Sequence, residues 1–270
     1  MSVTSPRSES AAHVPSVRHV ADHATLLALT GGDPYVRWGI PDPLPAPALV
    51  VEGAVAVERH GRRRGYWVWP LEEAADPAGA VRSAVATLAD GGYLEPAEVA
   101  GLSVAQPYLA AAADIVELAD GGDWEWMWTV TAPPPEPGEE ELVELSDSAD
   151  AEEIAAMIAR HNPRAWTEPG TGRTELWLGL RDERGELVLV GGMERLDNGV
   201  PHLAGILTAT GLRGRGLGRM VSAALTRRAL ELSPVCTLGM YSDNGPARAV
   251  YRRLGYRTAK AWSSRRLVRP

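Results

Sequence analysis

The sequence predicts an α+β protein built in two parts. Its C-terminal half has the order strand, helix, three strands, helix, strand, helix, strand, which is typical of a mixed sheet with an antiparallel middle. A segment rich in proline and glutamate, TVTAPPPEPGEEELVEL, separates this half from the rest. The length of 270 residues leaves room for two compact domains. We therefore expect a disordered tail over 1–15, an N-terminal α/β domain over 16–130, a linker over 131–141 and a second domain over 142–270.

The N-terminal half mixes strands and helices. The stretch ALVVEGAVAVERHGRRRGYWVW, residues 48–69, predicts two apolar strands on either side of a turn with arginines at 62–64. Helical spacing over residues 77–92 predicts a helix that ends at the glycine pair 91–92. DWEWMWTV, residues 123–130, predicts a strand with three tryptophans on one face, which favours core packing over a ligand-stacking platform.

The pattern of the C-terminal half predicts both strands and helices. Apolar and alternating runs predict strands at 141–145, 174–182, 185–196, 201–210, 235–242 and after Gly255. Helices are predicted after a cap at Ser146 or Asp147, from Gly216 to Glu231, and from Asn244 to Gly255. In the second of these helices, spacings of three and four predict a buried face formed by Leu217, Val221, Ala224, Leu225 and Leu232.

Composition excludes several classes of function. A net charge of −8 argues against general affinity for nucleic acid or anionic membranes, and no apolar run approaches the roughly 18–20 residues that cross a bilayer. The N-terminus has no apolar core typical of a secretory signal, and Cys236 is the only cysteine, so we expect a cytoplasmic protein. We expect it to be a monomer or a homodimer. Lys260 is the only lysine, which disfavours a lysine nucleophile.

The strongest chemical signal is LRGRGLGRMV, residues 212–221, at the start of the second predicted helix. Glycines there leave backbone N–H groups unshielded, and the helix N-terminus adds partial positive charge. Arg213, Arg215 and Arg219 add formal cations. The loop is therefore suited to a phosphate or pyrophosphate. It matches neither the Rossmann pattern, because Arg219 stands where the third glycine belongs, nor a P-loop, because no lysine is near.

What remains is the pattern R-x-x-G-x-G, and with it residues 140–262 resemble the catalytic domain of the GNAT superfamily of acyl-CoA-dependent N-acetyltransferases. A second motif, LGMYSDNGPARAVYRRLGYR at 238–257, resembles another signature of that family in register. The resemblance implies a mixed central sheet flanked by helices and acetyl-CoA as co-substrate, with no metal. It implies coenzyme A contacts by Ile206, Leu207, Thr208, Arg213, Gly214, Arg215, Gly216, Leu217, Gly218, Arg219, Asn244 and Tyr251.

Two of these residues lie on one face of the last predicted helix, because Asn244 and Tyr251 are seven residues apart. By resemblance, Asn244 holds the pantetheine arm and Tyr251 is the general acid that protonates the departing thiolate. The strand residues 206–208 are expected to pair with pantetheine as another strand would.

The general base is not fixed by the sequence. Some GNAT enzymes carry a glutamate five residues before the motif asparagine, and here that position is Gly239. Glu194 and His202, at the ends of neighbouring predicted strands, are the candidates, with Tyr241 as a further alternative. Cys236 is expected to be a buried, unreactive thiol.

Three hypotheses remain for function, and the sequence disfavours the third, an unrelated nucleotide-binding protein, because it has neither an acidic ribose-binding residue nor a P-loop lysine. The first is transfer of an acetyl group to a small-molecule amine or a protein amino group, by direct attack of the amine on the thioester. The second is a non-catalytic acyl-CoA-binding or regulatory protein of the same fold. The N-terminal half has neither motif, and a degenerate second GNAT-like lobe is the analogy that we expect for it.

Overall fold

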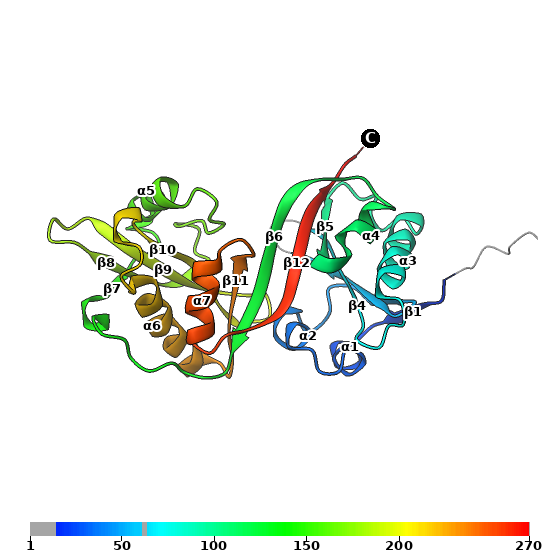
Figure 1. Ribbon diagram of the computed structural model, residues 1–270, viewed down its shortest axis with the longest axis horizontal. Helices are drawn as coiled ribbons and strands as arrows, with labels where there is room; N and C mark the ends of the chain where they lie inside the picture. Colours follow the sequence, from blue (N-terminus) through cyan, green and yellow to red (C-terminus); the bar gives the residue numbers. More distant parts are fainter. Residues whose placement is uncertain (1–14, 61–63, 270) are drawn as a thin grey trace, which may run out of the picture.

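The computed structural model describes residues 15–60 and 64–269. Residues 1–14 of the expected tail, and two arginines of the expected turn, Arg62 and Arg63, lie outside the described residues. Within them, twelve strands form one continuous mixed sheet in the order β1-β2-β3-β4-β5-β12-β6-β11-β10-β9-β8-β7. Helices cover both faces, and the molecule has two lobes joined at β6 and β12 (Figure 1).

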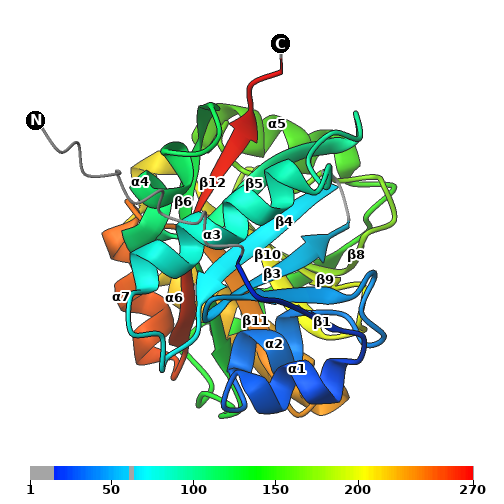
Figure 2. The ribbon, with the colours of Figure 1, turned by 90° about the vertical axis from the view of Figure 1, so that its right-hand side faces the viewer.

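The N lobe consists of β1–β5, β12 and four α-helices. Its strands are β1 (Val17–Val20), β2 (Ala48–Val51), β3 (Ala54–Arg59), β4 (Arg64–Pro70), β5 (Val99–Ala105) and β12 (Arg257–Leu267). Its helices are α1 (His23–Leu29), α2 (Pro34–Gly39), α3 (Pro77–Asp90) and α4 (Leu109–Ala113). Buried side chains of α3 and α4 pack on one face of this part of the sheet, and those of α1 and α2 contribute to a separate core (Figure 2).

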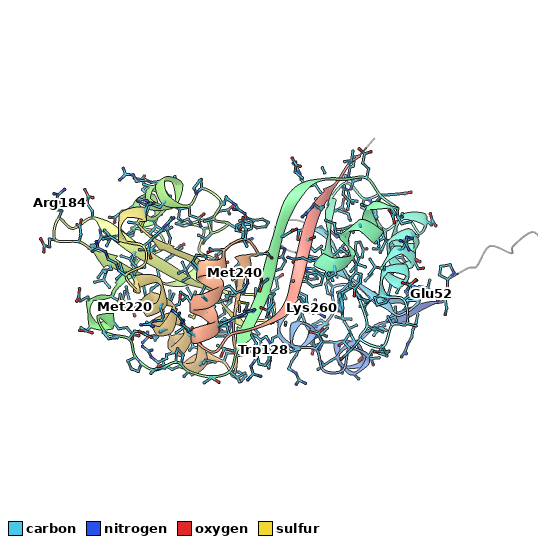
Figure 3. The ribbon with its side chains drawn as sticks, in the orientation of Figure 1. Glu52, Trp128, Arg184, Met220, Met240 and Lys260 are labelled. Carbon is cyan, nitrogen blue, oxygen red and sulfur yellow. The ribbon has the colours of Figure 1, made fainter. Side chains whose placement is uncertain are left out.

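The C lobe consists of β6–β11 and three α-helices. Its strands are β6 (Leu118–Thr129), β7 (Val143–Leu145), β8 (Thr174–Arg181), β9 (Leu187–Arg195), β10 (Pro201–Thr208) and β11 (Cys236–Tyr241). Its helices are α5 (Ala151–His161), α6 (Leu217–Leu232) and α7 (Gly245–Arg253). The core under α6 and α7 includes Met220 and Met240, whereas α5 packs with Trp177 in a second core (Figure 3).

The lobes exchange their last strands. β6 follows β5 in the chain but pairs with β11 of the C lobe, and β12 follows α7 but pairs with β5 of the N lobe. The two exchanged strands then pair antiparallel with each other along the middle of the sheet. The sheet therefore runs through the boundary that the sequence predicts at 131–141, and neither side of that boundary holds all the partners of its own strands.

Both lobes have the same pattern of strand pairing. In the N lobe, β1 to β4 are antiparallel neighbours, β4 and β5 are parallel, and β5 meets β12 antiparallel. In the C lobe, β7 to β10 are antiparallel, β10 and β11 are parallel, and β11 meets β6 antiparallel. A helix connects each parallel pair, α3 in the N lobe and α6 in the C lobe. This is the crossover that a parallel pair requires.

Most predicted elements are present, and four expectations are wrong in detail. The stretch at 48–69 holds three strands, because Glu52 (φ 50°) and Gly53 (φ 86°) form a tight turn between β2 and β3. Helix α5 begins later than predicted, after Asp150. Leu232, predicted to lie on the buried face of α6, is 57% exposed at the end of the helix.

Among the described residues, none of the helices has the length and the apolar character that a membrane span requires.

The linker is the fourth correction, because it is packed rather than solvated. Glu136 and Glu139 pair with Arg219 and Arg227 of α6, and the side chains of both glutamates are at most 15% exposed. The acidic run therefore neutralises arginines on α6 and holds the linker against the C lobe.

Candidate functional site

The sheet opens between β10 and β11. Their parallel ladder pairs only His202 with Thr237 and Leu203 with Leu238. Beyond these pairs β10 continues to Thr208, with a bulge after Ala204, and β11 continues to Tyr241. The strands diverge there, so the edges of both carry backbone N–H and C=O groups that no neighbouring strand pairs. Residues 206–208, predicted to contact pantetheine, lie on this free stretch of β10, and the Leu207 side chain is buried on the α5 side.

The glycine loop leads from β10 into α6 at the mouth of this opening. Gly214 (φ 80°) and Gly216 (φ 85°) adopt left-handed conformations that favour glycine, and Gly216 is the N-cap of α6. No side chain caps the helix. A Cβ added at Gly211, Gly214 or Gly216 would meet nothing within 4 Å. The first N–H groups of α6 are therefore exposed in an open cradle, as an anion site requires.

The three arginines of the loop have different surroundings. Arg213 donates from Nη2 to the carbonyl oxygen of His161 (2.7 Å), which fastens the loop to the end of α5. Arg219 is paired with Glu136 (2.7 Å), so its charge is already compensated. Arg215 is exposed and forms no hydrogen bond or ion pair through its side chain with any of the described residues. Arg215 is thus the cation of this loop that is open to a ligand.

Asn244 and Tyr251 lie at the start and near the end of α7. The Asn244 side-chain oxygen accepts from the N–H of Ala247 (3.1 Å), so it caps the helix and its amide N–H₂ group remains a donor. Tyr251 is 8% exposed and belongs to the core under α6, with its ring edge against Tyr256. Asn244 is thus the N-cap, just before the first helical residue, whereas Tyr251 lies near the other end of the nine-residue helix.

Burial controls the acid–base chemistry of this core. It raises the pKa of Tyr251 to about 12, against the opposing effect of the Ser222 hydroxyl, and the phenol therefore stays protonated at neutral pH. Burial also raises the pKa of the Cys236 thiol to about 12. Cys236 is fully buried and accepts from the Tyr256 hydroxyl (3.1 Å), which agrees with an unreactive thiol.

The two candidate bases are neighbours on the sheet. His202 on β10 is the register partner of Glu194 on β9. Glu194 accepts from the Thr167 hydroxyl (3.1 Å), and His202 Nδ1 lies 2.9 Å from the Thr237 hydroxyl. The adjacent Leu203 packs in the α6 core. His202 therefore faces the other side of the sheet, away from Tyr251.

Sequence reasoning missed the loop that follows α5. In this α5–β8 loop, residues 162–173, Arg164 pairs with Asp243 (2.9 Å) and its carbonyl oxygen accepts from the Tyr241 hydroxyl (3.0 Å). The Trp166 indole N–H also donates to Tyr241. The loop thus reaches across the opening from the β10 side to the end of β11. The loop also helps to form an open pocket of about 260 Å³. The residues that line this pocket are Asn162, Arg164, Tyr241, Asp243 and Asn244.

In the described part of the chain, no group of three histidine, cysteine, aspartate or glutamate side chains is placed to hold a metal ion.

Comparisons with known proteins agree with this geometry. Residues 177–267 match the family described as FR47-like protein. A GCN5-related N-acetyltransferase from Sphaerobacter thermophilus is similar in structure, with a TM-score of 0.55 and 16% identity over 95% of this chain and 96% of that one. A second, from Kribbella flavida, has a TM-score of 0.51 and 18% identity over 92% and 96%.

A GNAT-family acetyltransferase from Colwellia psychrerythraea has a TM-score of 0.52 and 13% identity over 94% of this chain and all of that one. No curated protein matches the sequence. These similarities extend over both lobes, and the FR47-like region spans the opening between β10 and β11 and the glycine loop. The chain has the GNAT N-acetyltransferase fold.

Proposed function

We propose that the protein is an acyl-CoA-dependent N-acetyltransferase, which moves the acetyl group of acetyl-CoA to a primary amine of a small molecule or a protein. The observation that carries the proposal is the opening between β10 and β11, which ends at the uncapped N-terminus of α6. A ligand with a diphosphate at one end and an amide-rich arm at the other fits this combination.

The loop at 213–219 would bind the diphosphate. Its backbone lies in open space, since a Cβ at Gly214 or Gly216 would meet no atom within 4 Å, and Arg215 supplies a positive charge that none of the described residues pairs. Arg213 acts indirectly by holding the loop to α5. Arg219, the third expected contact, also forms an ion pair with Glu136 of the linker.

The free edge of β10 at 206–208 would pair with the amide groups of the pantetheine arm, in the way that an added strand pairs with an open sheet edge. The Asn244 amide donor lies at the far side of the opening, at the end of the β11–α7 turn. The reacting thioester would then sit where β10 and β11 begin to diverge.

Tyr251 would donate the proton that the departing thiolate needs. A phenol with a pKa of about 12 is a weak acid toward a thiolate in water, but the thiolate would form in the same core. The Cys236 thiol shows the effect of that core on sulfur, since burial raises its pKa to about 12 as well. We expect the same burial to raise the pKa of the departing thiol, which would lower the free-energy cost of proton transfer from Tyr251.

The alternative is a non-catalytic acyl-CoA-binding or regulatory protein. Gly239, at the position where some GNAT enzymes carry a glutamate base, is the observation that favours it. Both functions require the same binding site, and they differ only in whether acetyl leaves the site on an amine.

Calorimetric titration of acetyl-CoA into the purified protein tests the binding site. We expect a dissociation constant in the micromolar range, no binding of NADH, and loss of acetyl-CoA binding in Gly216→Trp, whose side chain blocks approach to the backbone. Gly185→Trp is the matched control, because Gly185 also has φ 80° and open surroundings but lies in the β8–β9 turn. Unchanged affinity in Gly216→Trp would contradict the proposed site.

A thiol-release assay with a panel of primary amines then separates the two functions. Amine-dependent release of coenzyme A supports the transferase. Tight acetyl-CoA binding without release for any amine or protein amino group supports the non-catalytic alternative.

A further inference from the structure

We propose that His202 is the general base of the reaction, and that its Nε2 atom accepts the proton of the attacking amine over Gly239. This inference rests on the proposed transferase function. It replaces the three open candidates, Glu194, His202 and Tyr241, by one, and it accounts for the glycine at position 239.

The hydrogen bonds around His202 fix which ring nitrogen is available. The Thr237 hydroxyl donates its only proton to the carbonyl oxygen of Pro201 (3.0 Å). Its oxygen must therefore accept in the contact with His202 Nδ1 (2.9 Å), which makes Nδ1 the protonated nitrogen of the neutral ring. Nε2 is left with a free lone pair. Thr237 thus orients the ring and selects the tautomer that a base needs.

The free nitrogen lies at the apex of the opening. An ideal Cβ on Gly239 would lie 3.7 Å from Nε2 and 3.8 Å from the indole ring of Trp124. A longer side chain at position 239 would fill the space in front of the imidazole, whereas glycine leaves it open to a small group. The last paired residues of β10 and β11, Leu203 and Leu238, follow His202 and precede Gly239. Nε2 is therefore next to the point where the strands part.

His202 and Tyr251 lie on opposite faces of the sheet. Tyr251 belongs to the core under α6 and α7, and His202 faces the side of α5. A thioester held between the diverging strands presents its carbonyl carbon to an amine on the His202 face, and its sulfur to the phenol on the Tyr251 face. The two proton transfers are thus separated in space, and neither group has to perform both.

The electrostatic surroundings keep the imidazole neutral before the reaction. Burial lowers the pKa of His202 to about 4, so the ring is an acceptor at neutral pH. Among the groups that face it, Glu194 on β9 is the charged one. Thr237 and Gly239 on β11 and Trp124 on β6 carry no charge.

The step conserves atoms and charge. The lone pair of the neutral amine forms the C–N bond, which makes its N–H protons much more acidic than those of the free amine, and one proton passes to Nε2. The C–S bond breaks as the tetrahedral intermediate collapses, and the sulfur takes the phenolic proton of Tyr251. The products are the amide and the free thiol, and the imidazolium and phenolate return to their starting forms by net transfer of one proton through solvent.

His202→Asn is the variant that tests the inference. Asparagine can keep the hydrogen bond to Thr237 but has no atom at the Nε2 position. We expect kcat/KM at pH 7 to fall about 10²–10⁴-fold with acetyl-CoA affinity unchanged, because general-base catalysis contributes that much. The loss should shrink at high pH, where hydroxide can take the proton of the tetrahedral intermediate in place of Nε2. A purely structural role for His202 would not give this pH-dependent rescue.

Glu194→Gln is the control for the competing base. It keeps the contact with Thr167 and removes only the charge, so we expect at most a several-fold loss. If Glu194→Gln abolishes transfer and His202→Asn does not, the base is Glu194 and the inference is wrong. His202→Gln serves as a second variant should the asparagine variant fail the acetyl-CoA binding check.

Nitrogen NMR of the imidazole gives a readout that does not depend on activity. We expect His202 to be the Nδ1–H tautomer at pH 7, and an Nε2–H tautomer overturns the inference. Full turnover of His202→Asn while the wild type transfers acetyl also overturns it and leaves the transferase function intact. A wild type that binds acetyl-CoA but transfers acetyl to no amine refutes both.

Discussion

The N lobe and the C lobe share a strand order but differ at the parallel pair. In the C lobe the ladder between β10 and β11 stops after two register pairs, and in the N lobe the ladder between β4 and β5 runs through five, from Arg64 and Val99 to Val68 and Val104. The same topology therefore gives an open groove in one lobe and a closed sheet in the other.

The helix that follows each parallel strand differs in the same sense. α6 begins at Gly216, with no side-chain cap and open space around its first N–H groups. α3 begins after Asp76, whose carboxylate accepts from the N–H of Gly79 (2.9 Å). A carboxylate of the chain itself thus occupies the place where the C lobe would hold a diphosphate.

The comparison indicates that the two lobes have different roles. We infer that the N lobe is a degenerate copy whose groove has closed, and that it supports the C lobe through shared strands. β12 places Trp262 (0% exposed) in a core with Tyr35 and Trp126, and Lys260 on the same strand pairs with Asp33 and lies over the Trp69 ring (Figure 3). The tryptophans of β6 are part of this packing, as the sequence predicts.

The largest expected effect comes from separating the halves. β6 has both its strand partners in the C-terminal fragment, and β12 has both of its partners in the N-terminal fragment. We therefore expect fragments 15–130 and 131–270 to be insoluble or unfolded when expressed alone, and to form a folded complex when expressed together. Circular dichroism and size-exclusion chromatography measure this.

The control for the split is a full-length protein cleaved at a protease site placed within 133–137, after folding. Its halves should stay associated and keep their affinity for acetyl-CoA. A fragment 131–270 that folds alone and binds acetyl-CoA would show instead that the C lobe is autonomous and that the strand exchange contributes little.

The next effect concerns the helices that follow the parallel pairs. Tyr251 on α7 is the proposed acid, whereas Tyr108, beside α4 in the N lobe, is a partly buried tyrosine in the corresponding region. We expect Tyr251→Phe to lower kcat about 100-fold with little change in acetyl-CoA affinity, and Tyr108→Phe to leave both unchanged. Steady-state kinetics and calorimetry separate the two parameters. A fall in affinity with unchanged turnover at saturation would make Tyr251 a binding residue.

The sequence predicts the C lobe better than the N lobe because its signals are local. The glycine loop, the cap at Asn244 and the stop at Gly255 each act within a few residues of the element that they define. The N lobe instead turns at Glu52, a residue that rarely adopts a positive φ, and the pattern therefore reads as one strand where the structure has two.

Contacts between distant segments are the part that the sequence does not contain. The exchange of β6 and β12 cannot be predicted from the local sequence, because the residue pattern of a strand does not depend on which strand it pairs with. The ion pair of Arg219 with Glu136, 83 positions earlier in the chain, is likewise not contained in the glycine-loop motif. The proximity of Glu194 and His202 follows from the hairpin register, but the tautomer of His202 depends on Thr237 on another strand.

The smallest effect tests whether the N-lobe cap alone closes its groove. Asp76→Ala removes the carboxylate from the N-terminus of α3, and we expect a loss of about 1 kcal/mol in the free energy of unfolding, as for other caps of this kind. We also expect calorimetry to give one acetyl-CoA per chain for both the wild type and the variant, because the ladder between β4 and β5 remains closed. A second binding site in Asp76→Ala would mean that the carboxylate, rather than the strand pairing, is what distinguishes the N lobe from the C lobe.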